Sequence, residues 1–324
     1  LIPNKPLHIS SPWKIIRDYL NALTPSKIST VTPLASGVEP IYSLKSSRRT
    51  LIMAILNMSP ESFSNGKMEV QSPSHKGMSS VLDDFVNDGA SIIDIGGQSS
   101  KPFAQDISSE EEIARVMPAI EHAQRYNSQV KNIAISVDTY RAEVANAAVK
   151  SGADIVNDIS AGTLDANMLT TMAKLGKTVC FTHMRGTPST MSSLTDYPGG
   201  LIPTIARDLT QRIKAAELSG IRRWRIILDP GIGFAKTLDQ NLEILRQFHE
   251  LKTWPGLEGF PWLVGSSRKG FIGKITGVKV PHERIWGTSA TVSAAVMSGA
   301  DIVRVHDVKE MAQVAKMSDS IWRV

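Results

Sequence analysis

The chain alternates between short apolar runs and longer segments in which apolar residues recur at helical spacing. A polar cluster follows each apolar run, as expected where a buried parallel strand ends at an edge of its sheet. The eight predicted strands are Leu51–Leu56, Ile92–Ile95, Ile133–Val137, Asp154–Val156, Thr178–Phe181, Arg225–Leu228, Trp262–Val264 and Asp301–Val305.

Eight helices are predicted between and after these strands, and several of them stop at a glycine. They comprise 79–88, a segment that begins at Ser109, then 141–152, 164–176, 204–220, 238–251, 285–299 and 308–324. Strict alternation predicts an α/β fold, a (β/α)8 TIM barrel whose strands all end on one rim. An open doubly wound sheet is the rival, but the chain has neither a phosphate-loop motif nor G-x-G-x-x-G.

Residues 1–50 differ from the rest of the chain. Apolar residues at helical spacing begin at Trp13, and the stretch from Pro25 to Ser47 is rich in Ser, Thr and Pro without a sustained period. We therefore expect one short helix and a linker before a barrel domain at 51–324. Because the sequence starts at Leu1 rather than Met, we also expect a fragment of a longer polypeptide.

Composition narrows the class of protein. A length of 324 residues with 42% hydrophobic content suits one barrel, and no run approaches the roughly 18 apolar residues of a membrane span. The net charge of +5 favours small anionic substrates, whereas the short, isolated basic stretches argue against nucleic acid. The single cysteine, Cys180, lies in an apolar run and is expected to be a buried, inert thiol.

Amide or carboxylate groups mark the ends of four predicted strands, namely Asn57, Asp138, Asn157 and Asp229. Such groups match a planar nitrogen heterocycle that carries alternating donors and acceptors, and a carboxylate can accept two parallel N–H groups. Together the four predict a site for an aminopyrimidine-like ligand.

Cationic residues mark the later strand ends: Lys269 after Arg268, and Arg304 with His306, while Lys101 follows the second strand. Cations at a barrel mouth bind phosphate or carboxylate. The segment 229–236 is a Gly-rich loop in which Phe234 offers an aromatic face and Lys236 a charge. There is no G-x-S-x-G and no H-E-x-x-H, so any metal is expected to be Mg²⁺ held by an oxygen ligand and substrate phosphates.

In this order, the polar segments resemble those of dihydropteroate synthases over about residues 51–324. The matching motifs are Ile55-Leu56-Asn57-Met58-Ser59-Pro60-Glu61-Ser62-Phe63-Ser64, Asp94-Ile95-Gly96-Gly97-Gln98-Ser99, Ser136-Val137-Asp138-Thr139, Val156-Asn157-Asp158, His183-Met184-Arg185-Gly186-Thr187-Pro188, the stretch 229–236, Ser267-Arg268-Lys269-Gly270-Phe271-Ile272-Gly273 and Arg304-Val305-His306-Asp307. Residues 1–50 resemble the tail of a hydroxymethyl-dihydropterin pyrophosphokinase and a linker, the order found in fungal-type multifunctional folate enzymes.

The resemblance implies a transferase that condenses 6-hydroxymethyl-7,8-dihydropterin pyrophosphate with p-aminobenzoate, in competition with sulfonamides. It implies that Asp138, Asn157, Asp229, Lys269 and Arg304 bind the pterin, and that Asn57, Ser100, Lys101, Arg304 and His306 bind pyrophosphate with Mg²⁺ at Asn57. Catalysis would rest on Asn57, Lys269, Arg304 and His306. The p-aminobenzoate pocket would contain Phe63, Ser100, Lys101, Pro102, Phe234, Lys236 and Gly270.

The sequence departs from the family pattern in the loops that surround p-aminobenzoate. Ser100 and Lys101 stand where Thr and Arg are usual, Asn65 where Asp is common, and Gly270 where Ser is frequent. The changes in the second loop motivate one alternative, a pterin-binding module without catalysis. The other alternative is a methyl-transferring pterin barrel, because the wider pterin-binding group shares the aspartate and asparagine pattern.

The resemblance also implies a homodimer through late helices, with Val296 and Met297 as contributors. Upstream pterin-pathway domains would accompany the barrel on one polypeptide, and the location would be mitochondrial or cytoplasmic.

Overall fold

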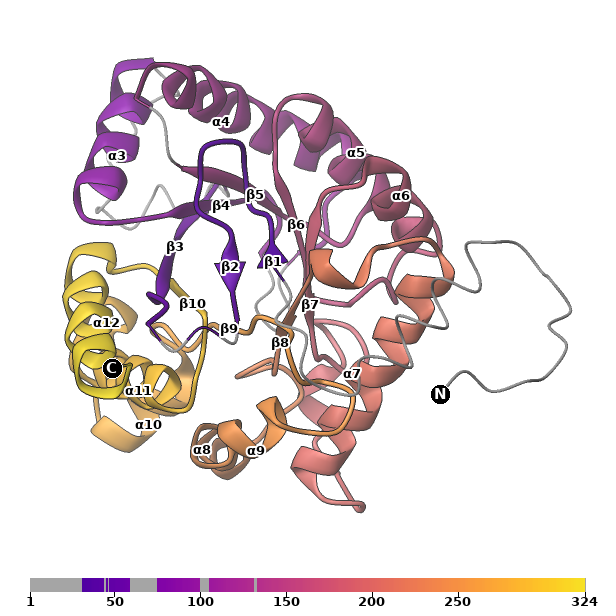
Figure 1. The fold of residues 1–324 in the computed structure, drawn as a ribbon, viewed down its shortest axis with the longest axis vertical. Coiled ribbons are helices and arrows are strands. Elements are labelled where there is room, and N and C mark those ends of the chain that lie inside the picture. The colour runs from indigo at the N-terminus through magenta and orange to yellow at the C-terminus, as the bar shows by residue number, and fades with distance from the viewer. Residues whose placement is uncertain are drawn as a thin grey trace, which may run out of the picture.

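Eight parallel strands form a barrel in the computed structural model, which describes residues 31–43, 45, 47–58, 75–99, 105–130 and 133–323 (Figure 1). Neighbouring strands pair in the order β8-β7-β6-β5-β4-β3-β10-β9, and a parallel bridge from Leu228 to Trp262 joins the two outer members. This confirms the predicted TIM barrel. The strands are β3 (Leu51–Asn57), β4 (Ile92–Gly96), β5 (Ala134–Asp138), β6 (Ile155–Asp158), β7 (Thr178–Thr182), β8 (Ile226–Asp229), β9 (Leu263–Val264) and β10 (Ile302–Val305).

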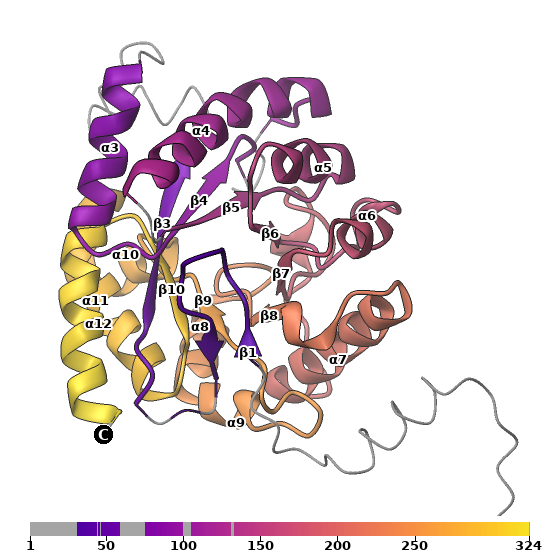
Figure 2. The same cartoon turned by 45° about the horizontal axis from the view of Figure 1, so that its top comes forward.

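Helices surround the barrel (Figure 2). They are α3 (His75–Asn87), α4 (Ser109–Val130), α5 (Ala142–Lys150), α6 (Met168–Leu175), α7 (Leu201–Leu218), α8 (Leu238–Arg246), α9 (Phe248–Lys252), α10 (Gly270–Thr276), α11 (Ile285–Met297) and α12 (Val308–Trp322). The predicted helix over 238–251 is two helices, because the chain bends at Gln247. The short α10 was not predicted, because seven residues give too little periodicity.

The barrel interior has an apolar lower layer and a polar upper layer. Alternate residues of a strand point inward, so one strand can contribute Ile92 below and Asp94 above, and another Ala134 below and Asp138 above. The lower layer is a buried cluster that includes Cys180, and burial raises the pKa of its thiol, as expected for an inert cysteine. The polar residues therefore gather at the carboxyl ends of the strands.

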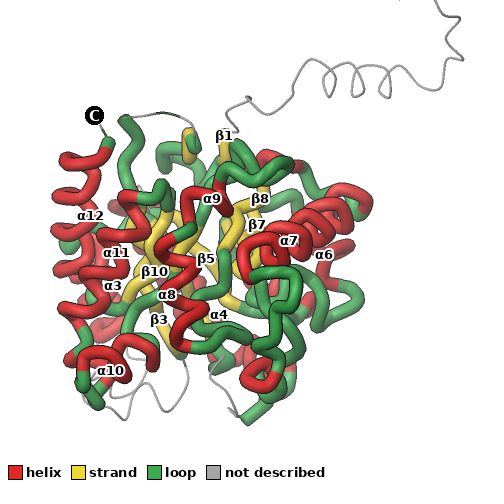
Figure 3. The backbone as a smooth tube through the Cα atoms, turned by 90° about the horizontal axis from the view of Figure 1, so that it is seen from below, coloured by secondary structure: helices red, strands yellow, loops and turns green. Residues whose placement is uncertain are grey.

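A small hairpin closes the opposite end of the barrel. Its strands, β1 (Val31–Thr32) and β2 (Ile41–Tyr42), pair antiparallel, and Leu34 and Ile41 pack into the apolar lower layer. The hydroxyl of Thr178 on β7 also donates to the carbonyl of Pro33. Figure 3 shows β1 at one end of the molecule and α10 at the other. The sequence pattern predicts a linker over this stretch, whereas in the structure it packs as the floor of the barrel.

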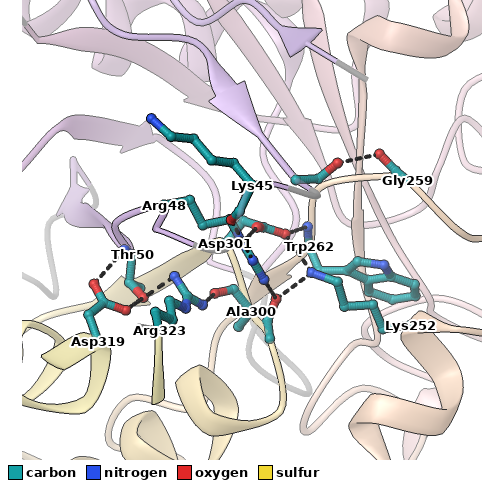
Figure 4. A network of polar contacts seen from close by, with 12 residues as sticks. Lys45, Arg48, Thr50, Lys252, Gly259, Trp262, Ala300, Asp301, Asp319 and Arg323 are labelled. Carbon is teal, nitrogen blue, oxygen red and sulfur yellow. Dashed lines mark hydrogen bonds and ion pairs between the residues drawn. The ribbon is translucent and has the colours of Figure 1, made fainter. Parts of the chain in front are cut away.

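A charged network lies beside this floor (Figure 4). Asp301 accepts hydrogen bonds from Arg48 Nε at 2.6 Å and from Lys252 Nζ at 3.2 Å, and it also accepts from the backbone N–H of Trp262 at 2.9 Å. Its side chain is 1% exposed. Asp301 therefore fastens the segment before β3 to the C-terminal part of the barrel.

Candidate active site

The barrel brings the predicted strand-end residues to its polar upper layer. Asn57, Asp138 and Asp229 are the last residues of β3, β5 and β8, and Asn157 and Arg304 lie one residue before the ends of β6 and β10. Lys269 immediately precedes α10, and His306 follows β10. The predicted loop residues Phe63, Ser100, Lys101 and Pro102, together with Asn65, lie outside the described residues.

Arg304 is the centre of a largely buried ion-pair cluster. Its Nε donates to Asp94 Oδ2 and its Nη2 donates to Asp138 Oδ2, each at 2.6 Å. Asn157 Nδ2 donates to the same oxygen of Asp94 at 3.0 Å. Burial raises the pKa of Asp138 to about 7 although Arg304 opposes the rise, and the paired carboxylates raise the pKa of Arg304 against its own burial.

Asp94 belongs to this site but was not predicted as a site residue. It lies in the middle of a fully buried strand. The sequence does carry a signal for it. Alternate residues of a strand point inward, and a charged residue at an inward position of an apolar strand needs a partner inside the barrel. The hydroxyl of Ser267, which contacts His306, was missed as well.

Asp229 and Lys269 form a second part of the site. Burial raises the pKa of Asp229 and lowers that of Lys269 to about 8, and each charge opposes the other's shift. One Asp229 oxygen accepts from the N–H of Gly231 at 2.7 Å. The Lys269 ammonium contacts the carbonyl of Ile232 and lies 4.6 Å from the centre of the Phe234 ring. The Gly-rich loop thus places an aromatic face beside Lys269.

Lys236 points beneath this loop rather than out of it. Its Nζ contacts Phe234 O at 2.9 Å, His183 Nδ1 at 3.1 Å and His183 O at 3.4 Å. His183 Nε2 lies 3.3 Å from Asp208 on α7, and burial lowers the pKa of Lys236 to about 7. A Cβ at Gly231 would lie 2.0 Å from the carbonyl oxygen of His183, so only glycine permits this close packing. In this geometry Lys236 holds the loop that carries Phe234.

The Ser267–Lys269 segment is held in a strained turn. Arg268 has a φ of 60°, which is rare for a residue with a side chain, and its guanidinium forms two hydrogen bonds with Asp307. The Ser267 hydroxyl accepts from His306 N–H at 3.2 Å and lies 3.0 Å from His306 Nδ1. This turn thus carries Lys269 and, through Ser267, contacts His306. A Cβ added at Gly270 would meet nothing within 4 Å.

Two further features bear on the candidate chemistry. A cavity of about 160 Å³ lies beside His183 and extends toward Asp208 and Arg212 on α7, away from the Arg304 cluster. Within the described ranges, no group of three His, Cys, Asp or Glu side chains could hold a metal ion. Any Mg²⁺ bound through Asn57 would therefore take most of its ligands from substrate and water. The described helices include none that is long and apolar enough to cross a membrane.

The fold and this set of buried acceptors and cations define a ligand-binding barrel, and comparison with known proteins gives its class. The profile of the family "Pterin binding enzyme" matches residues 53–306. The dihydropteroate synthase of Synechocystis is 47% identical over 276 residues, which cover 85% of this chain and 91% of that protein.

The folic acid synthesis protein fol1 of Pneumocystis carinii is also 47% identical, over 95% of this chain, but the chain spans only 41% of that protein's length. The structure of Xanthomonas albilineans dihydropteroate synthase with 4-aminobenzoic acid superposes with a TM-score of 0.78 at 32% identity, and covers 92% of this chain and 100% of that one. The chain belongs to the pterin-binding enzymes and, among them, to the dihydropteroate synthase family.

Proposed function

We propose that this chain condenses 6-hydroxymethyl-7,8-dihydropterin pyrophosphate with p-aminobenzoate, giving 7,8-dihydropteroate and pyrophosphate. The observation that carries the proposal is the paired arrangement of the polar layer. Carboxylate and amide acceptors lie on β5, β6 and β8, and cationic groups lie at β10 and before α10. A heterocycle with N–H donors and a diphosphate together match both sets of groups.

Asp138, Asn157, Asp229 and Lys269 would hold the pterin. Asp229 is buried and the Asp138 side chain is only 14% exposed, which supports this because a carboxylate shielded from water favours a ligand that donates hydrogen bonds to it. The Lys269 ammonium contacts the Ile232 carbonyl and the Phe234 ring. As a hydrogen-bond donor it would bind a carbonyl oxygen or a ring nitrogen of the ligand.

Asn57, Arg304 and His306 would hold the pyrophosphate, with Mg²⁺ bound to Asn57 and the phosphate oxygens. When bound, the metal would neutralise part of the leaving group's charge. Arg304 lies near the carboxyl end of β10 and His306 directly follows that strand. Both would stabilise the charge of the leaving group as the bond between the pterin methylene carbon and oxygen breaks. Ser100 and Lys101 would complete the anion site from the second loop.

The new bond joins the nitrogen of p-aminobenzoate to the methylene carbon. The arylamine attacks as the neutral species, the electron pair of the broken C–O bond leaves with pyrophosphate, and the nitrogen then loses one proton to solvent. Phe234 and the Gly270 backbone would border the p-aminobenzoate, with Phe63, Ser100, Lys101 and Pro102 supplied by the loops. Lys236 would act by holding Phe234 in place. Sulfonamides should compete because they present a similar arylamine.

The experiment is a pyrophosphate-release assay with purified chain, Mg²⁺, p-aminobenzoate and the pterin pyrophosphate. We expect release that requires all four, and formation of dihydropteroate by mass spectrometry. If calorimetry detects pterin binding while no product forms, the chain is a non-catalytic pterin-binding module. A requirement for a corrinoid methyl donor would instead favour the methyl-transferring barrel.

We further propose that the chain acts as a homodimer and as the synthase part of a longer polypeptide. Large apolar side chains on neighbouring α11 and α12 support the dimer: Trp286 is 86% exposed, Met297 53% and Met317 62%. Val296 was expected to contribute but is 1% exposed, because it packs inside a core cluster with β3 and β10. The greater length of the fungal relative supports additional domains. A mitochondrial or cytoplasmic location stays a prediction.

A further inference from the structure

Asp94 connects the two halves of the site from below. It lies on the inner face of β4, and its carboxylate accepts from Asn157 on one side and from Arg304 on the other through the same oxygen, Oδ2. The residue is fully buried. Asn157 belongs to the proposed pterin half and Arg304 to the pyrophosphate half, so one carboxylate orients a residue in each.

Carboxylate chemistry fixes the orientation of the Asn157 amide. Paired with the Arg304 guanidinium, Asp94 is a carboxylate and can only accept hydrogen bonds. Asn157 must therefore turn its NH₂ group toward Asp94. The carbonyl oxygen and the second N–H of the same NH₂ group remain. Because the amide can no longer turn over, its oxygen is fixed as the acceptor that position 157 offers to a donor on the ligand.

Arg304 is constrained in the same way. Its Nε is committed to Asp94 and its Nη2 to Asp138. These two contacts fix the plane of the guanidinium, and Nη1 is the nitrogen that neither carboxylate of the cluster engages. A planar group held at two points presents its remaining N–H groups in one direction.

A purely structural role does not account for Asp94. Its second oxygen, Oδ1, is buried without a hydrogen-bond partner among the described residues, and so is the hydroxyl of Ser136, its neighbour in register on β5. An unsatisfied carboxylate oxygen costs stability when it is buried. The Asp301 carboxylate at the barrel floor, in contrast, uses both oxygens.

We propose that Asp94 is a positioning residue that sets the hydrogen-bonding polarity of the pterin site, by presenting the Asn157 carbonyl oxygen to the ligand while it orients Arg304 for the leaving group. The proposal rests on the proposed function and adds a residue that touches neither substrate. It predicts that exchanging the acid and the amide at both positions, 94 and 157, restores part of the pterin binding that either single exchange removes.

The test is a polarity swap between the two positions. In Asp94→Asn the new amide can offer its carbonyl oxygen or its NH₂ to Asn157, so the NH₂ of Asn157 is free to turn toward the ligand. In Asn157→Asp two carboxylates face each other. In the double variant D94N/N157D the NH₂ of the new amide donates to the new carboxylate at position 157. Arg304 Nε loses the oxygen that it shared with Asn157, and Arg304 keeps Asp138 as its partner, so the swap restores the pterin half of the site alone. The second oxygen of that carboxylate again faces the ligand as an acceptor, and the total charge equals that of the wild type.

Binding of the pterin pyrophosphate is measured by calorimetry, alongside the KM values of both substrates. We expect each single variant to bind the pterin at least about 50-fold more weakly, and the double variant to recover at least about tenfold of that loss. The KM of p-aminobenzoate should change less than about threefold. Asp301→Asn, which alters a buried carboxylate at the other end, is the matched control and should leave pterin affinity unchanged.

Two results would overturn the inference: a double variant that binds no better than either single variant, or an Asp94→Asn variant with wild-type pterin affinity. Thermal unfolding is followed for all variants. If Asp94→Asn does not fold, the comparison of Asn157→Asp with the double variant still decides the question. Failure of the wild type to bind the pterin pyrophosphate would refute the proposed function itself, whereas wild-type binding without rescue refutes only the role of Asp94.

Discussion

The two ends of the barrel both bury charged networks, but the networks carry opposite excess charge. At the floor, one carboxylate, Asp301, meets two cations, Arg48 and Lys252. At the mouth, two carboxylates, Asp94 and Asp138, share one cation, Arg304. Both oxygens of the central carboxylate at the floor accept hydrogen bonds, whereas Asp94 Oδ1 at the mouth has no hydrogen-bond partner among the described residues. We infer from this difference that the floor network serves the fold and that the mouth can accept a ligand.

The floor network should give the largest effect on stability. Asp301→Asn leaves two largely buried cations without their carboxylate, so we expect the free energy of unfolding to fall by about 4 kcal/mol. Urea denaturation followed by circular dichroism measures it. Turnover per folded molecule should remain at the wild-type level, and a selective loss of turnover with normal stability would place Asp301 in the active site instead.

The hairpin that covers the floor is the next test. Leu34 is 4% exposed and packs against the lower interior layer, so Leu34→Ala should lower the free energy of unfolding by about 3 kcal/mol. Leu218→Ala is a matched control, because Leu218 is 90% exposed and should change stability by less than about 0.5 kcal/mol. Equal effects of the two substitutions would mean that the hairpin is only a linker.

The mouth should respond in affinity rather than in stability. Asp229→Ala removes an acceptor from the proposed pterin half, and we expect pterin affinity to fall by about 2 kcal/mol because ligand donors lose their partner. The fold should persist, because the negative charges of Asp94 and Asp138 then equal in number the positive charges of Arg304 and Lys269. Calorimetry with the pterin pyrophosphate gives the affinity, and an unchanged value would exclude Asp229 from the site.

The pH dependence of pterin affinity should separate the mouth from the floor. The pKa of Asp138 is raised to about 7 and that of Lys269 is lowered to about 8, so both are charged together mainly between these values. We expect the KM of the pterin to rise on both sides of this window, by about tenfold for each pH unit well outside it. In Asp138→Asn the acid side should flatten while the alkaline side remains. An unchanged acid side in that variant would assign the titration to another group.

These two groups make opposite contributions to stability. The Asp138 contribution is complete below its unfolded pKa of about 3.8 and is lost as pH rises through about 7. The Lys269 contribution is complete above about 10.5 and is lost as pH falls through about 8. The free energy of unfolding is measured across this pH range for the wild type, Asp138→Asn and Lys269→Met. The difference between the wild type and Asp138→Asn should change with pH in the opposite direction to the difference between the wild type and Lys269→Met.

The smallest effect is expected at Gly270. A side chain there has open space and a helical start, so Gly270→Ser should change the free energy of unfolding by less than about 0.5 kcal/mol. The added hydroxyl should lower the KM of p-aminobenzoate by about threefold, equivalent to one weak hydrogen bond. The pterin KM serves as the internal control. A lower pterin KM with an unchanged p-aminobenzoate KM would place Gly270 in the wrong half of the site.

The strands and most rim residues could be predicted from the sequence because each strand is a buried apolar run that stops at a polar residue. Asn57, Asp138 and Asp229 close their strands as expected. The hairpin escaped prediction because its two-residue strands give no alternation to detect. Asp94 escaped because a single inward charge inside a strand reveals its partner only when Arg304, 210 residues away, closes the barrel beside it.

Lys236 shows a different limit. Its position after the Gly-rich loop suggested a contact with substrate, but sequence spacing does not reveal the direction of a long side chain. In the structure its ammonium turns inward to the His183 backbone and ring. Contacts made by a flexible side chain depend on tertiary packing, so its role as a loop clamp could not be predicted from sequence alone.

The most direct test of the division between mouth and floor is a paired measurement on Asp94→Asn and Asp301→Asn. Pterin affinity by calorimetry and the free energy of unfolding by urea denaturation are determined for both under identical conditions. We predict that Asp94→Asn loses pterin affinity but little stability, because Arg304 keeps Asp138, and that Asp301→Asn loses stability but no affinity. Loss of the same property in both variants would contradict the account.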